Sequence, residues 1–438
     1  MKRALALLVL LSVVVLAAPA ANAAGPLPQI LTLREQAAVY NGWLEDRLDH
    51  ILPELMRQEG FDMWLVICRE NNEDPVFFSL VPFNNLYASR TSMLVFFDRG
   101  GDAGVERLTV SRSGIGQLYK SAWEPEKVEQ WARLGQIIKE RNPKKIGINE
   151  SETFNYGDGL SATLKRKLTA ALPVELAPRV ASAERLAVRW LERRSAAELE
   201  TYPHIAAIAH AIIAEAFSPA VVTPGVTTTD DVAWWMRERS RQLGLNNWFH
   251  ATVDAQRPKD SPHKTSNVIF RGDLLHCDFG ITYLKLNTDT QELAYVLREG
   301  ETDAPKGLKD GLAQGNRLQD IQISEMKAGR TGNQVLAATL TRAKSEGLRP
   351  SVYTHPLGVH GHAAGTLIGM WDMQNGVPGA GDFQFFDDTV HSIELNVTAG
   401  VPEWGNQDVR FALEHDAVLT KDGVKFLDQR QTTLLLIR

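Results

Sequence analysis

Two aspartates eleven residues apart are the feature of this sequence best suited to chemistry. Asp278 and Asp289 each lie in an apolar, strand-like run within the segment HCDFGITYLKLNTDTQELAYVL. A buried carboxylate is costly unless a cation meets it, and two facing carboxylates repel each other. If residues 274–297 form a hairpin that turns near Tyr283 and Leu284, the two aspartates are directly opposite, with Cβ atoms about 4.5–5.5 Å apart. That spacing fits a two-metal site, whose ions lie about 3.5–4 Å apart. The pair alone fits equally well an ordinary hairpin with its acids on the solvent side.

A cluster of histidines supplies the imidazoles that such a site could use. His355, His360 and His362 lie within the glycine-rich segment YTHPLGVHGHAAGT. A lone histidine is more often structural, but three within eight residues favour metal binding or catalysis. Eight of the eleven histidines lie in residues 250–415, so we expect the chemistry in the second half of the chain.

Two glutamates complete a recognisable order of candidate ligands. Glu394 lies in HSIELNVT and Glu414 in VRFALEHDAVLT, both strand-like apolar runs. Each alone would be interpreted as an acid at a strand edge. Their value lies in the order Asp, Asp, His, Glu, Glu along the chain.

In that order the second half resembles the methionine aminopeptidases, Xaa-Pro aminopeptidases and prolidases, the M24 metallopeptidases with the pita-bread fold. The first half resembles the creatinase/prolidase N-terminal domain, at Gly60-Phe61-Asp62 before the run WLVI. The matching motifs of the second half are Asp278-x-Gly280 with Asp289, Gly361-His362-Ala363-Ala364-Gly365, Glu394, and Glu414 with Thr420 and Gly423.

The resemblance implies an α+β protein of two domains. A pita-bread catalytic domain is expected over residues 191–438, preceded by a smaller α/β creatinase-like N-terminal domain over 24–190. The residue patterns agree with mixed structure, since they alternate between helical and strand-like runs. They predict helices over 35–58 and 196–220 and after the capping cluster 227–231, and strands over 63–67, 92–97, 106–110 and 145–149.

The resemblance also implies roles for the candidate residues. Asp278 would bind one divalent ion, Asp289 and Glu414 would bridge two, and His362 and Glu394 would complete the second site. A carboxylate-rich set suits Mn, Co, Fe or Zn. A water bound to both ions would attack the peptide carbonyl, and Glu394 would accept its proton.

Another histidine and several departures from the family pattern qualify this interpretation. His263 matches the histidine that contacts the substrate near the scissile bond, with an ordinary loop histidine as the equal alternative. His355 and His360 are candidates to replace missing neighbours of the metal, and His360 is an alternative ligand to His362. Xaa-Pro preference stays open because of the departures, which are Lys285-Leu286 for Gly-Tyr, Gln291-Glu292 for Thr-Arg, Gly369 for His, Leu395 for Pro, and Arg410 four residues before Glu414.

Composition bounds the location and the partners. Residues 1–23 have a basic start, an apolar run and the ending Ala21-Asn22-Ala23, which predict a cleaved signal peptide and a periplasmic or secreted protein without membrane contact. The net charge of −6 argues against nucleic acid as a partner. Cys68 and Cys277 could form a disulfide or remain buried thiols.

Together these features predict an exported metal-dependent peptidase that acts at the N-terminal end of short peptides through a water activated by two metal ions. The family often dimerises, so a homodimer is a candidate assembly. One alternative is a metal-dependent hydrolase of a non-peptide C–N bond or an ester on the same scaffold. Another is a non-catalytic binding module, which would predict a broken set of ligands.

Overall fold

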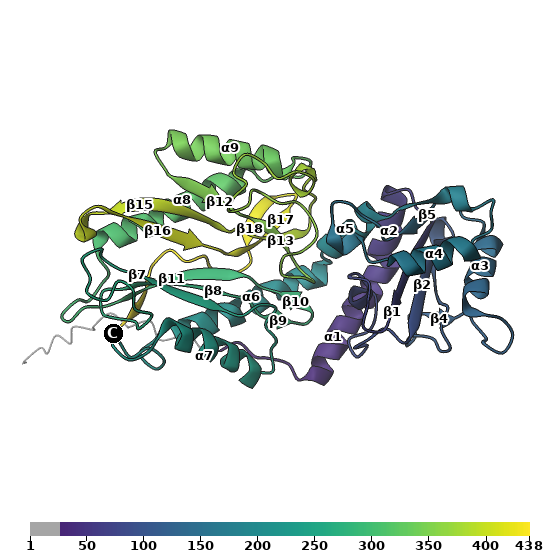
Figure 1. Ribbon diagram of the computed structural model, residues 1–438, viewed down its shortest axis with the longest axis horizontal. Helices are drawn as coiled ribbons and strands as arrows, with labels where there is room; N and C mark the ends of the chain where they lie inside the picture. Colours follow the sequence, from purple (N-terminus) through teal and green to yellow (C-terminus); the bar gives the residue numbers. More distant parts are fainter. Residues whose placement is uncertain (1–26) are drawn as a thin grey trace, which may run out of the picture.

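The structure, a computed structural model, consists of two lobes that lie side by side (Figure 1). It describes residues 27–438, so the predicted signal peptide at 1–23 lies outside the described residues. The N-terminal lobe, purple to blue, runs through α5, and the larger C-terminal lobe begins at α6 (Figure 1). Within the described residues, no helix combines the length and the apolar character needed to cross a membrane.

The N-terminal lobe is built on a six-stranded mixed sheet. Its strands are β1 (Met63–Arg69), β2 (Thr91–Asp98), β3 (Val105–Thr109), β4 (Lys120–Ser121), β5 (Ile146–Ile148) and β6 (Val180–Ser182). They lie in the order β4-β3-β2-β1-β5-β6, with β2 antiparallel to both of its neighbours. The central strand β1 is buried along six of its seven residues. It therefore forms the middle of the lobe, as its continuous apolar sequence predicts.

Helices cover both faces of this sheet. They are α1 (Leu33–Asp46), α2 (Leu52–Gln58), α3 (Gln130–Arg141), α4 (Ala162–Ala171) and α5 (Glu184–Glu192). A π turn over Arg47–Ile51 joins α1 and α2, so the helix predicted over 35–58 is present with a local widening in its middle. Thr32 and Glu35 form a capping box that fixes where α1 begins.

The C-terminal lobe has strands between two layers of helices (Figure 1). Its elements are α6 (Ala196–Ala216), α7 (Thr229–Gln242), β7 (Thr252–Gln256), β8 (Leu274–Phe279), β9 (Thr282–Tyr283), β10 (Leu286–Asn287), β11 (Thr290–Val296), α8 (Lys306–Glu325), α9 (Gly332–Ser345), β12 (Pro350–Val352), β13 (His355–Leu357), β14 (Thr389–Ser392), β15 (Leu395–Val401), β16 (Gln407–Leu413), β17 (Asp416–Thr420), β18 (Gly423–Phe426) and β19 (Leu435–Ile437). Helices α6 and α7 pack on β7, β8 and β11, whereas α8 packs on β15 and β16 and α9 packs on β12. The predicted capping cluster is confirmed, since Thr228 and Asp231 form the capping box of α7.

Alternation along β8 and β11 separates a core face from the face that carries chemistry. Cys277 and Phe279 of β8 belong to the core shared with α6 and α7. Leu274 of β8 and Leu293 of β11 belong to the core beneath α8 and α9. Because successive strand residues point to opposite faces, Asp278 lies on the same face as Leu274, toward the interior between the sheets.

Candidate metal centre

The hairpin of β8 and β11 carries both aspartates. Asp278 pairs with Gln291 across the hairpin, and β9 and β10 continue the same register. The prediction that Asp278 and Asp289 are directly opposite is therefore wrong. The turn occupies Leu284 and Lys285, one residue later than predicted, which moves each partner by two residues. A shift of two residues leaves side chains on the same face, so both aspartates still point to one site.

Breaks between strands position the two glutamates beside this hairpin. Glu394 lies between β14 and β15, and Glu414 between β16 and β17. The backbones of Gln291 and Glu414 pair with each other, which joins the two sheets at this point. The side-chain amide of Gln291 donates to Glu394 Oε1 at 3.0 Å and to Glu414 Oε2 at 2.7 Å. Gln291 therefore links the two glutamates to each other.

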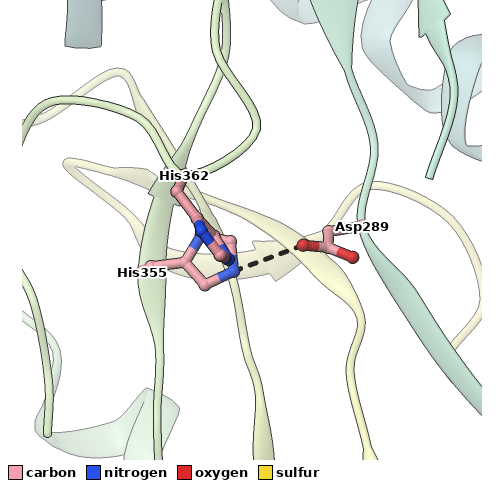
Figure 2. Close-up of side chains that lie close together, drawn as sticks. All are labelled: Asp289, His355 and His362. Carbon is pink, nitrogen blue, oxygen red and sulfur yellow. Dashed lines mark ion pairs between the residues drawn. The ribbon is translucent and has the colours of Figure 1, made fainter. Parts of the chain in front are cut away.

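Two histidines face the carboxylates from β13 and the loop that follows it. His355 Nε2 lies 3.2 Å from Glu414 Oε1 and 3.4 Å from Asp289 Oδ2. Figure 2 shows this second contact as a dashed line, with His362 beside His355 on the same side of the site. The rings of His355 and His362 are 4.6 Å apart and nearly perpendicular. His355 is buried, whereas His362 is exposed.

These side chains form three overlapping groups of metal-binding size. Within each group one ligand atom from every residue lies within 4.8 Å of the others. The groups are Asp278, Asp289 and Glu414; His355, Glu394 and Glu414; and Asp289, His355 and His362. The structure thus brings the five residues predicted as ligands to one place, and it adds His355.

Burial and mutual repulsion disfavour charge on these acids. Burial, and then the charge of Glu414, raises the pKa of Asp278 to about 7. The same two causes, in the same order, raise the pKa of Asp289 and that of Glu394 well above their usual ranges. Burial, the largest single cause, opposes the charged form of His355. The hydrogen bond to Glu414 and the charges of Glu414 and Glu394 together outweigh burial and raise the pKa of His355 to about 9. The cluster therefore favours positive charge at its centre.

The chemistry of the cluster fits divalent ions. Asp278 Oδ1 and Asp289 Oδ1 are buried and accept no hydrogen bond from the residues that the structure describes. A buried carboxylate oxygen without a donor is costly, and a cation would remove that cost. Carboxylate oxygens with imidazole nitrogens form a donor set suited to Mn, Fe, Co or Zn.

His360, the alternative ligand, lies outside all three groups. Its ring stacks on Tyr156 with centroids 4.3 Å apart. Burial and then the charge of Arg194 lower the pKa of His360 to about 4, so its imidazole is neutral. The geometry favours His362 over His360 as the ligand.

His263 also lies apart from the carboxylates in the described part of the chain. Its ring stacks on Phe270 at 3.7 Å. The loop that carries it follows Gln256, whose partner Leu274 lies four residues before Asp278. That is about 13 Å along the strand. Contact of His263 with the substrate stays a prediction without structural support.

Several residues near the site were not predicted from the sequence to lie there. Tyr353 has its ring 5.5 Å from that of His355, and Trp248 has its ring 5.1 Å from that of His362. Aromatic side chains at these positions could equally have been core residues. Gln291 did give a signal, because it replaces the threonine expected from the family pattern.

Behind Gln291, a series of hydrogen-bonded side chains leads away from the carboxylate cluster. Gln291 Oε1 contacts His276 Nε2 at 2.9 Å, and His276 Nδ1 contacts Asp254 Oδ2 at 2.9 Å. Because both nitrogens of His276 face acceptors, the imidazole is a double donor. Burial opposes its charge, but the hydrogen bonds to Asp254 and Gln291 and the charge of Asp254 together outweigh burial and raise the pKa of His276. This series of hydrogen bonds fixes the orientation of the Gln291 side-chain amide.

The two cysteines are free and buried in different lobes. Cys68 lies in β1 and Cys277 in β8. Of the two predicted alternatives, the structure shows buried thiols and no disulfide between them.

Comparisons with known proteins agree with the geometry of the site. The sequence model of metallopeptidase family M24 matches residues 202–421, which include every residue of the three groups. A comparison with curated proteins finds no match.

Solved structures similar to this chain share its fold at low identity. X-Pro aminopeptidase from Thermotoga maritima MSB8 is 17% identical with a TM-score of 0.62, over 87% of this chain and 99% of that one. Xaa-Pro dipeptidase from Bacillus anthracis is 16% identical with a TM-score of 0.60, over 92% and 100%. The N-terminal domain of FACT complex subunit SPT16 from Cicer arietinum (chickpea) is 11% identical with a TM-score of 0.53, over 93% and 99%.

These similarities confirm the predicted α+β class, with a pita-bread domain after a smaller N-terminal domain. Proteins with such different names share the fold, so the fold alone does not identify an activity. Function is therefore inferred from the residues of the site.

Proposed function

This chain belongs to metallopeptidase family M24, and from that premise we propose that it is an exported dinuclear peptidase that cleaves short peptides at their N-terminal end. The observation that carries the proposal is the meeting of four carboxylates and two imidazoles at one site. Two buried aspartate oxygens there accept no hydrogen bond from residues 27–438. Export is supported by the sequence of residues 1–23. The dinuclear state is supported by the overlap of the three groups.

The ligands divide between two ions in a way that the overlapping groups suggest. Asp278 would hold one ion, and Asp289 and Glu414, the two carboxylates that belong to two groups each, would lie between the ions. His362 and Glu394 would hold the second ion. His355, bonded to Glu414, would steady that carboxylate or add a ligand.

When bound, a pair of divalent ions lowers the pKa of a shared water and polarises the substrate carbonyl. Glu394 is the proposed proton acceptor, as the resemblance to family M24 implies. Gln291 holds Glu394 and Glu414 in place through its amide. His362, the exposed member of the site, marks the side from which a peptide would enter.

The name of one similar structure supports a preference for free N-termini, since X-Pro aminopeptidase from Thermotoga maritima MSB8 shares the fold of this chain. An aminopeptidase removes the residue that carries the free α-amino group. A blocked N-terminus would lack that group. The sequence departs from the family pattern at Lys285-Leu286 and Gln291-Glu292. Experiment must therefore decide whether the residue after the cleaved bond is proline or another.

A screen of metal-reconstituted protein against dipeptides and tripeptides, with Xaa-Pro members included, tests the proposal. We expect release of the N-terminal residue with Mn, Co, Fe or Zn, and resistance of the N-acetylated peptides. Asp289→Ala and Glu414→Ala should abolish the activity, because each removes a ligand placed between the ions.

Glu292→Gln is the matched control. Glu292 is a buried acid on the same strand, but its carboxylate interacts with His210 of α6 on the opposite face of β11. This variant should keep the activity. Absence of cleavage with every ion, or equal cleavage of acetylated peptides, would refute the proposal.

A further inference from the structure

We propose that the N-terminal lobe positions both halves of the candidate metal centre. Tyr156 of that lobe contacts the histidine loop, residues 358–365, and the same lobe holds Lys285 at the tip of the aspartate hairpin of β8 and β11. The consequence for metal binding rests on the proposed function. The two contacts do not depend on the proposed function, because they join residues of this protein to one another. Both are proposed as positioning residues, since each would act through another segment of the chain.

Tyr156 contacts the histidine loop at two neighbouring points. It lies in a 3-10 turn over Asn155–Gly157, and its hydroxyl donates to the backbone carbonyl of His362. Its ring stacks on His360 with an interplanar angle of 29°. Burial raises the pKa of the phenol, so the hydroxyl stays a donor. Tyr156 therefore holds the residues on both sides of Gly361.

Trp248 closes the opposite side of the same loop. A Cβ on Gly361 would lie 2.2 Å from the indole ring of Trp248, so backbone and ring are in close contact. The indole Nε1 donates to the carbonyl of Thr288 at 2.9 Å, next to Asp289. The histidine loop thus lies between Trp248 of its own lobe and Tyr156 of the other. Loss of Tyr156 would release one side of it.

Lys285 fixes the tip of the aspartate hairpin against the N-terminal lobe. Its Nζ donates to the carbonyl of Phe78 at 3.1 Å and lies 4.4 Å from the ring centroid of Tyr40. Both partners belong to the N-terminal lobe. The side chain of Leu284, beside Lys285 in the turn, is also buried. The tip of the hairpin therefore packs into the neighbouring lobe.

The conformation of this turn is a separate sign that the tip is held from outside. Leu284 and Lys285 have φ of 54° and 59°, the left-handed region at both central positions. Such turns normally carry Asn-Gly or Gly-Gly, because other side chains are strained there. The contacts with the N-terminal lobe offset that strain. Since Asp289 lies four residues beyond Lys285, the position of the tip bears on the position of a ligand.

Hydrogen exchange of the full-length, metal-free protein tests the two contacts with Tyr156→Phe and Lys285→Gly. The first removes one hydroxyl and keeps the ring. The second removes the side chain but suits positive φ, so any loss cannot come from turn strain. We expect exchange about fivefold faster in residues 355–365 for the first variant and in 284–291 for the second, the effect of one lost hydrogen bond.

Two matched controls should leave both segments unchanged. Tyr87→Phe removes a hydroxyl from an exposed tyrosine of the N-terminal lobe. Asn406→Gly changes an exposed residue that has the same φ of 59° in the C-terminal lobe. Wild-type exchange rates in both test variants would overturn the proposal.

The affinity for Mn²⁺, measured by titration of the same proteins, tests the consequence for the metal centre. Each test variant should bind Mn²⁺ about fivefold more weakly than wild type, because part of the binding free energy would be used to order the loop or the hairpin. Faster exchange with unchanged affinity would contradict the positioning role. If wild type bound no divalent ion, the proposed function would fail, and the exchange rates alone would decide the lobe contacts.

Discussion

At the scale of single residues, the site gathers negative charge that its own hydrogen-bond donors only partly offset. Four carboxylates share one buried space, and the donors that reach them come from His355 and Gln291. The family order of ligands made the five acids and imidazoles predictable. His355 was predicted only as a candidate neighbour of the metal. Its contacts with Glu414 and Asp289 were not predictable, because they depend on β13 pairing with β14, where His355 lies opposite Ser392.

Gln291→Glu should destabilise the metal-free protein by about 2 kcal/mol, because a donor to two carboxylates becomes a further buried carboxylate. Urea denaturation with and without Mn²⁺ measures this, and the ion should recover part of the loss. Gln117→Glu, in an exposed loop, is the control and should stay near wild type. An unfolding midpoint for Gln291→Glu equal to that of the control would contradict the geometry of the site.

The histidines can be separated by their effect on metal affinity. His355→Ala and His362→Ala should each weaken Mn²⁺ binding about tenfold or more, the typical effect of losing a ligand or a residue that orients one. His360→Phe keeps a ring against Tyr156 and should cost less than either. Calorimetric titration measures all three. If His360→Phe were the most damaging, His360 would be the ligand and His362 its neighbour.

At the scale of elements, the sequence predicts what local patterns determine and fails where a distant contact decides. The helix over 35–58 and the cap of α7 follow from periodicity and from capping residues. The turn of the aspartate hairpin was misplaced by one residue, because Leu284-Lys285 lacks the residues that favour such a turn. Contacts with the other lobe hold it there, and no local pattern shows them.

A buried cluster of charged side chains joins α1 and α6 at the junction of the lobes. Arg47, after α1, contacts Glu198 of α6 at 2.8 Å, and Arg194 contacts the other oxygen of Glu198 at 3.1 Å. Burial opposes the charge of Glu198, but the charges of Arg194 and Arg47 and the hydrogen bonds from Ser195 and Arg47 together outweigh burial and lower the pKa of Glu198. The carboxylate therefore binds protons less readily in the folded chain than in the unfolded one.

Glu198→Gln should destabilise the protein by about 3–5 kcal/mol at neutral pH, because it leaves two buried arginines without a carboxylate. Since the folded pKa is lowered, the stability due to Glu198 is present above its unfolded pKa of about 4.3 and is lost as the pH falls through the folded value. Unfolding curves from pH 7 to pH 3 should therefore converge in acid. A gap that widened in acid would contradict the assignment, and Glu140→Gln, in a surface pair, is the control.

At the scale of the whole molecule, two lobes with separate sheets meet around the site. Chain length and the change of pattern near residue 190 made two domains predictable. How the lobes dock was not predictable, because Tyr156 and Lys285 lie in segments that resemble ordinary loops and turns. The docking brings residues from both halves of the chain to the histidine loop.

The two free thiols report on the integrity of both lobes. Cys68 and Cys277 are buried, and burial raises the pKa of Cys68 to about 12, so neither should react with a thiol reagent while the protein is folded. Both should be labelled together in urea, and a reducing agent should leave the melting temperature unchanged. A melting temperature that falls when the reducing agent is added would indicate a disulfide instead.

The central claim is that this molecule holds divalent ions in one buried cluster of carboxylates and imidazoles. Equilibrium dialysis of metal-stripped protein against Mn²⁺, followed by measurement of the bound ions, tests it most directly. We predict about two ions per chain for wild type and for Glu292→Gln, as in a two-metal hydrolytic site, and fewer for Asp289→Ala. A wild-type chain that binds no ion, or an Asp289→Ala chain that binds as many as wild type, would contradict the claim.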